Sequence, residues 1–168
     1  MAVLPLAGLP ANSNVFIDAN ILVYGLTGQS PQCQQLLERC SREEVFGICS
    51  FSVLSEATHR FMIAEAKSKN LIPGGGPAKA LEANPPVVSA LRDYWQNVLR
   101  ILNMNLLLLT LSDRIFRGAQ NERQNAGLLT NDSLVVASMR EYGIAALASH
   151  DHDFDRVAGL QVFAPDDI

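Results

Sequence analysis

The stretch VFIDANILVY, residues 15–24, places a carboxylate at the end of a short apolar run. Residues 15–18 are predicted to form a buried strand that ends on Asp18, and the amide of Asn20 follows two residues later. Either polar side chain could cap a following helix. The stretch therefore raises the question of why an acid closes the most apolar opening segment of the chain.

The composition is that of one folded domain spanning residues 1–168. Of the 168 residues, 48% are hydrophobic and 18% are charged, which is near the globular average. A chain of this length buries about 70% of its unfolded surface, enough for one core. Residues 1–13 contain two prolines and a glycine and no leading positive charge, so we expect an irregular N-terminal tail and not a signal peptide.

Cysteine usage and charge limit the compartment and the partners. Three cysteines without zinc-like spacing are typical of a reducing compartment, and we expect the cytoplasm. We expect no membrane association, because no window reaches the roughly 20 apolar residues that cross a bilayer. A net charge of -4 argues against nucleic-acid binding through a general basic surface.

Strand patterns alternate with helical patterns along the chain. Such alternation predicts parallel pairing with right-handed crossovers, hence a three-layer α/β/α sandwich with a central, mainly parallel sheet of four to five strands. Residues 67–86 contain three consecutive glycines and several prolines, and we interpret them as a Gly/Pro-rich excursion. The expected strands are 15–18, 44–49, 105–109, 144–148 and 161–163, and the expected helices are 31–40, 52–67, 87–102, 112–125 and 132–142.

Acids recur where ligands bind in such sheets, beyond the carboxyl ends of the strands. Asp18 ends the first strand, and Asp151 and Asp153 follow the strand at 144–148. Glu56 lies one turn into a helix, and Asp132 begins another. Taken singly, each acid has a simpler explanation as a cap, an Asx-turn or a solvated residue. Together they predict one acidic rim.

Clustered acids require a counter-charge. Two carboxylates about 5 Å apart repel by roughly 3 kcal/mol at an effective dielectric of about 20. A hard divalent cation relieves this repulsion, and a set of oxygen ligands favours Mg²⁺ or Mn²⁺ over zinc. Such an ion can activate water and stabilise a phosphoryl oxygen, which predicts hydrolysis of a phosphodiester.

Four motifs resemble those of PIN-domain ribonucleases, closest to the VapC-type toxins of toxin-antitoxin systems. The motifs stand in the family's order and are VFIDANILVY, FSVLSEATHRF, LLTNDSLVVASM and LASHDHDFDRV. The resemblance covers residues 15–163. It implies a metal-dependent endoribonuclease that acts on single-strand or structured RNA, forms a homodimer and is inhibited by a cognate antitoxin protein.

The resemblance also assigns residues. It implies Asp18, Glu56, Asp132 and Asp151 as the catalytic and metal-binding acids. Asn20 would orient Asp18 or a metal-bound water, Ser149 would stand where the family usually has threonine, and Asp153 could share or take the role of Asp151. Candidates for phosphate contacts are Arg60, Arg114, Arg117 and Arg123, although each could be a solvated helix residue.

Other interpretations stay open at this point. His150 and His152 flank Asp151, but two histidines without a third nitrogen or sulfur ligand argue against zinc. A phosphatase with an aspartyl nucleophile would need a second aspartate at position 20, where this chain has Asn20. The remaining alternative is a catalytically inactive or solitary PIN-like module that binds or processes RNA.

Overall fold

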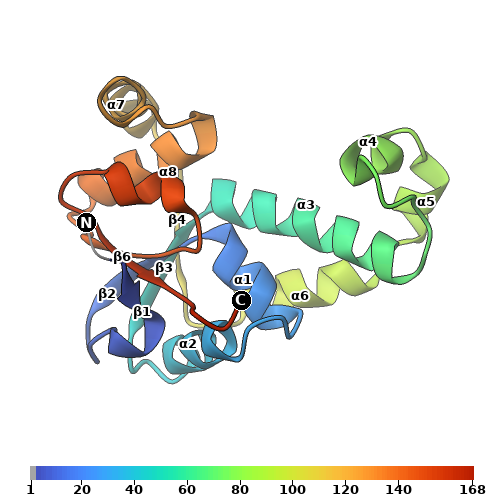
Figure 1. The fold of residues 1–168 in the computed structure, drawn as a ribbon, viewed down its shortest axis with the longest axis horizontal. Coiled ribbons are helices and arrows are strands. Elements are labelled where there is room, and N and C mark those ends of the chain that lie inside the picture. The colour runs from blue at the N-terminus through green and yellow to red at the C-terminus, as the bar shows by residue number, and fades with distance from the viewer. Residues whose placement is uncertain (1–2) are drawn as a thin grey trace.

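The computed structural model describes residues 3–168 and contains one sheet of parallel strands in the order β1-β6-β5-β2-β3-β4 (Figure 1). The two central strands consist almost wholly of buried residues, as strands covered on both faces do. The strand bounds are β1 Leu4–Pro5, β2 Asn14–Ile17, β3 Phe46–Ser50, β4 Leu107–Leu109, β5 Ala146–Ala148 and β6 Gln161–Ala164.

Helices cover the sheet on both sides. On one side lie α1, α2, α3 and α6, and on the other lie α7 and α8 (Figure 1). The helix bounds are α1 Ala19–Leu26, α2 Pro31–Ser41, α3 Phe51–Ser68, α4 Pro77–Glu82, α5 Pro85–Ala90, α6 Asp93–Leu102, α7 Asp113–Ala126 and α8 Thr130–Glu141. Among residues 3–168, no helix has both the length and the apolar character needed to cross a bilayer.

This architecture confirms the predicted α/β/α sandwich with a parallel sheet, but the predicted number of strands is wrong. The sheet has six strands because β1 pairs with β6, with Leu4 opposite Phe163. Leu6 and Leu9 are also buried, so the expected tail over residues 1–13 is not wholly irregular in its described part. A strand of two residues, one of them Pro5, is too short to show a pattern in the sequence.

Two helix predictions differ from the structure. The helix expected over residues 87–102 is divided into α5 and α6 at Leu91 and Arg92. Asp132 was expected to begin its helix, but α8 starts at Thr130 after the N-cap residue Leu129, so Asp132 lies within its first turn. The first difference has a tertiary cause, because Glu65 accepts hydrogen bonds from the backbone where the helix divides.

The far half of α3 forms an arm with α4, α5 and α6 that projects from the sheet (Figure 1). The arm has a small core of its own, built on Ala66, Leu81 and Leu91. The excursion at residues 67–86 lies in this arm, and it contains the whole of α4. The excursion therefore folds back onto α3.

A buried carboxylate ties this arm together. Glu65 Oε1 accepts from Lys69 Nζ at 2.6 Å and from Arg92 N at 2.8 Å, and Oε2 accepts from Tyr94 N at 2.8 Å. Burial opposes ionisation of Glu65, but these bonds and one from Asp93 N outweigh it, so the pKa falls from 4.5 to about 2. The ionised form is therefore part of the fold.

Replacing Glu65 by glutamine is expected to lower the free energy of unfolding at neutral pH by about 2–3 kcal/mol. Because the folded pKa is below the unfolded one, the stabilisation is complete above pH 4.5 and is lost as the pH falls towards about 2. Urea titrations between pH 2 and 7 measure this change in the free energy of unfolding. The exposed Glu82→Gln in the same arm is the control, and equal loss in both variants would contradict the prediction.

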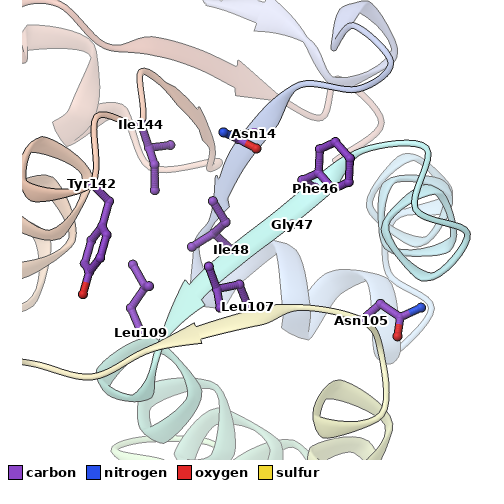
Figure 2. Close-up of a pocket in the computed structure, with 9 residues that line it drawn as sticks. All are labelled: Asn14, Phe46, Gly47, Ile48, Asn105, Leu107, Leu109, Tyr142 and Ile144. Atoms are coloured by element: carbon purple, nitrogen blue, oxygen red, sulfur yellow. The ribbon is translucent and has the colours of Figure 1, made fainter.

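One part of the sheet surface is open. Side chains from β3, β4 and the segment after α8 line a mainly apolar hollow of about 380 Å³ (Figure 2). Ile48, Leu109, Tyr142 and Ile144 point into it. The hollow does not include the acids predicted as site residues.

Candidate active site

The strand pairing brings two acidic segments together. Strands β2 and β5 are neighbours, with Ile17 opposite Ala148. Both strands therefore end at the same edge of the sheet, and Asp18 N donates to Ala148 O at 3.0 Å. Asp18 and Ser149, which are far apart in sequence, are the next residues of the two strands and lie side by side.

Asp18 is buried and receives three hydrogen bonds. Its Oδ1 accepts from Ala19 N at 2.7 Å, which makes it the N-cap residue of α1. Its Oδ2 accepts from Asn20 Nδ2 at 2.6 Å and from Ser149 Oγ at 2.7 Å. Burial raises the pKa of Asp18, the bonds from Ser149 and Ala19 oppose that rise, and the nearby Glu56 adds to it. Helix capping and a site role are therefore compatible.

Asn20 and Ser149 join the ends of the two strands. Asn20 Nδ2 also donates to Ser149 Oγ at 3.1 Å, and Asn20 Oδ1 accepts from His150 N at 3.1 Å. Ser149 Oγ in turn accepts from Asp151 N at 3.0 Å. Both side chains are buried, so this network determines where Asp18 and the backbone of Asp151 lie.

Helices α3 and α8 bring two further acids to the same edge. Glu56 is half-buried, and its carboxylate pairs with Arg60 Nη2 at 2.9 Å and accepts from Asn131 Nδ2 at 3.4 Å. Asn131 precedes Asp132, so this bond connects α3 to the first turn of α8. It holds the helix that carries Asp132 next to the helix that carries Glu56.

Asp132 lies at the centre of the acidic cluster. Its pKa rises from 3.8 to about 6, first because of burial and then because of Asp151, Asp18, Glu56 and Asp153. Carboxylate oxygens of Asp132, Asp151 and Asp153 lie within 4.8 Å of one another. The structure thus brings the five predicted acids around one point, and its tightest group includes Asp153 in place of Asp18 and Glu56.

The donor set fits a hard divalent cation. The tight group offers only carboxylate oxygens, and neither His150 nor His152 belongs to it. Burial raises the pKa of Asp132 first and the four neighbouring carboxylates raise it further, so a bound cation would favour its ionised form. Divalent cations such as Mg²⁺ prefer oxygen ligands of this kind.

The sequence analysis did not identify Arg156. Its Nη1 donates to Asp153 Oδ1 at 2.7 Å, and its other nitrogens donate to Ala126 O at 2.6 Å and Gly127 O at 3.2 Å. Arg156 therefore holds Asp153 against the loop that leads into α8. Its spacing of three residues from Asp153 was the only available signal, and the backbone acceptors cannot be seen in a sequence.

The four arginines expected to contact phosphate all have partners within the protein. Arg60 pairs with Glu56, and Arg123 lies 5.8 Å from the centre of the Phe116 ring. Arg114 pairs with Glu141, and Arg117 pairs with Asp113. Phosphate binding by these residues stays a prediction.

Comparisons with known proteins agree on one family. A model of the PIN domain matches residues 15–160. Ribonuclease VapC2 of Methanocaldococcus jannaschii is 26% identical over 150 residues, which cover 89% of this chain and 93% of that protein. Ribonuclease VapC6 of the same organism is 27% identical over 155 residues, which cover 89% of this chain and 96% of that protein.

A similar fold occurs in a solved toxin-antitoxin structure. The crystal structure of VapBC2 from Rickettsia felis bound to a DNA fragment from their promoter contains a chain that matches with a TM-score of 0.59 and 18% identity. The match covers 91% of this chain and 99% of that one. At this identity the match shows a shared fold.

Proposed function

This chain belongs to the PIN domain family, and we propose that it is a metal-dependent endoribonuclease that hydrolyses RNA phosphodiester bonds. The observation that carries the proposal is the acidic cluster around Asp132 at the carboxyl edge of the sheet. The two VapC relatives, which match over most of their length, are ribonucleases by name.

The metal is Mg²⁺ or Mn²⁺ in this proposal. Asp132, Asp151 and Asp153 supply the closest oxygens, and Asp18 and Glu56 complete the acidic surroundings. A bound divalent cation supplies positive charge that stabilises the phosphoryl oxygen and lowers the pKa of an attacking water.

The protein's own contribution is to hold these carboxylates in place. Asn20 and Ser149 fix the carboxylate of Asp18, and Arg156 fixes that of Asp153. Partners of this kind orient ligand side chains before the substrate arrives, and such preorganisation is a large part of catalysis. Glu56 is oriented in the same way by Arg60.

We assign the protein a role as the toxin of a type II toxin-antitoxin pair. A cognate antitoxin would cover the acidic site, and a homodimer is expected. The two VapC relatives and the fold shared with the VapBC2 complex support this assignment. A cytoplasmic location stays a prediction. A small gene for a DNA-binding antitoxin next to the gene for this chain would support the toxin role.

The test is cleavage of a mixed RNA pool by the purified protein. We expect cleavage with Mg²⁺ or Mn²⁺ and none with EDTA, and activity should return when the metal is added back in excess. Internal fragments on a sequencing gel would show endonuclease action. Full activity in EDTA would contradict a metal-dependent site, and inactivity with every divalent ion would favour an RNA-binding module.

A further inference from the structure

Three aromatic rings lie in a row beside the acidic cluster. His150 and His152 flank Asp151, and Tyr24 lies on α1, one helical turn after Asn20. The ring centres of Tyr24 and His150 are 6.0 Å apart, and those of His150 and His152 are 6.2 Å apart. We call Tyr24, His150 and His152 the aromatic strip.

Hydrogen bonds hold the two histidines of the strip next to the acids. Asn20 Oδ1 accepts from the backbone N of His150, so the residue that fixes Asp18 also places the central ring. At one end, His152 Nδ1 lies 3.0 Å from Asp155 Oδ2. Hydrogen bonds therefore fix the backbone of His150 and the ring of His152.

The rings are not explained by packing alone. The side chain of His152 is 83% exposed, and Tyr24 and His150 are only partly buried. The interplanar angles of 75° and 51° show that neither pair is stacked face to face. Ring surface is thus left for a flat partner at the exposed His152 and on the accessible parts of His150 and Tyr24, although Tyr24 also packs against the main hydrophobic core.

Charge alone gives this protein little attraction for RNA. The net charge is -4, and three of the four arginines expected to contact phosphate are paired with acids, as Arg60 is with Glu56. Proteins that bind single strands combine backbone charge with aromatic rings on which bases stack. Where the charge is weak, the stacking must contribute more of the affinity.

We propose that the aromatic strip stacks unpaired bases of single-stranded RNA and so leads the strand to the acidic cluster. This inference rests on the proposed function and assigns the side chains that would contact unpaired bases next to the cut site. A duplex keeps its bases stacked on one another and would not use the strip.

The histidines have two other conceivable roles. As metal ligands they would need a third nitrogen or sulfur ligand. Among residues 3–168, the group of side chains close enough to share a metal ion is Asp132, Asp151 and Asp153, which includes neither histidine. As proton donors or acceptors they would need an imidazole nitrogen, whereas stacking needs only a flat ring. Phenylalanine keeps the ring without the nitrogens, so it separates these roles.

The test is the affinity for a fluorescently labelled, unstructured 12-nucleotide RNA, measured by anisotropy in EDTA so that the proposed cleavage does not interfere. We expect Tyr24→Ala, His150→Ala and His152→Ala each to raise Kd about tenfold. His150→Phe, His152→Phe and Tyr24→Phe should stay within about twofold of the wild type. A duplex of the same sequence should show no such difference.

Tyr142→Ala is the matched control. Tyr142 is 52% exposed but lines the separate hollow on β3 and β4 (Figure 2), and its variant should bind RNA like the wild type. The ratio of variant to wild-type Kd should also be independent of salt, because stacking releases no counterions.

Two outcomes would overturn the strip. One is an alanine series with unchanged Kd, and the other is a phenylalanine series that loses as much as the alanine series. Binding is measured without cleavage, so the two hypotheses are tested separately. If the wild type cuts RNA but these variants have unchanged Kd, the proposed function stands and the role of the strip is refuted. If the protein binds RNA through the strip but never cuts it, the role of the strip stands and the proposed function is refuted.

Discussion

Asp132→Asn is expected to lower the rate of RNA cleavage by about 100-fold or more and to weaken the response to Mg²⁺. The negative charges of the four other acids all raise the pKa of Asp132. Asp132 is also one of the three residues whose carboxylate oxygens lie within 4.8 Å of one another. Asparagine keeps the size of the side chain but removes its charge. Initial rates over a series of Mg²⁺ concentrations measure both effects.

The same change has a second expected effect, on stability without metal. Since the folded pKa of Asp132 is about 6 and its ordinary value is 3.8, the metal-free protein loses stability as the pH rises from about 4 to about 6. The loss is on the order of 2 kcal/mol at this half-buried position. Asp132→Asn should remove that loss, so in EDTA at pH 7 the variant should be more stable than the wild type.

The prediction is specific because Asp132→Asn should lower the activity but raise the stability of the metal-free protein. A variant that simply disturbs the fold would lose activity and stability together. Asp113→Asn is the control, because Asp113 is 78% exposed and pairs with Arg117 on the surface of α7. If Asp132→Asn proves both active and less stable in EDTA, the cluster does not act as described.

Asn20→Ala is expected to lower activity by about 10- to 100-fold and to raise the Mg²⁺ concentration needed for half-maximal rate. Asn20 donates to Asp18 at 2.6 Å and to Ser149 at 3.1 Å, and it accepts from His150 N. Without it the carboxylate of Asp18 keeps its charge but loses one of the three bonds that orient it. Activity assays over Mg²⁺ concentration measure the change.

A general loss of folding would give a different result. Asn121→Ala, at an exposed position of α7, serves as the matched control and should leave the Mg²⁺ response unchanged. Circular dichroism melting of both variants shows whether they are folded. Half-maximal Mg²⁺ unchanged in a folded Asn20→Ala would show that Asn20 only supports α1.

Much of the fold could be predicted because buried strands show as apolar runs. Five of the six strands were expected near their observed positions, and the acids that follow them were expected at one edge. The missed strand β1 exists only through its pairing with β6. The division between α5 and α6 depends on Glu65, whose bonds to Arg92 and Tyr94 override the local helical pattern.

The sequence by itself determined that an acid closes the first buried strand and that further acids follow along the chain, because apolar runs and helix patterns are local properties. Only the tertiary structure decided what holds these acids. The bond from Asn20 to Ser149 spans 129 residues, and Arg156 reaches backbone carbonyls 29 and 30 residues away. Such contacts depend on how strands pair and where helices end, so Asp18 in VFIDANILVY is both a helix cap and a member of a carboxylate cluster.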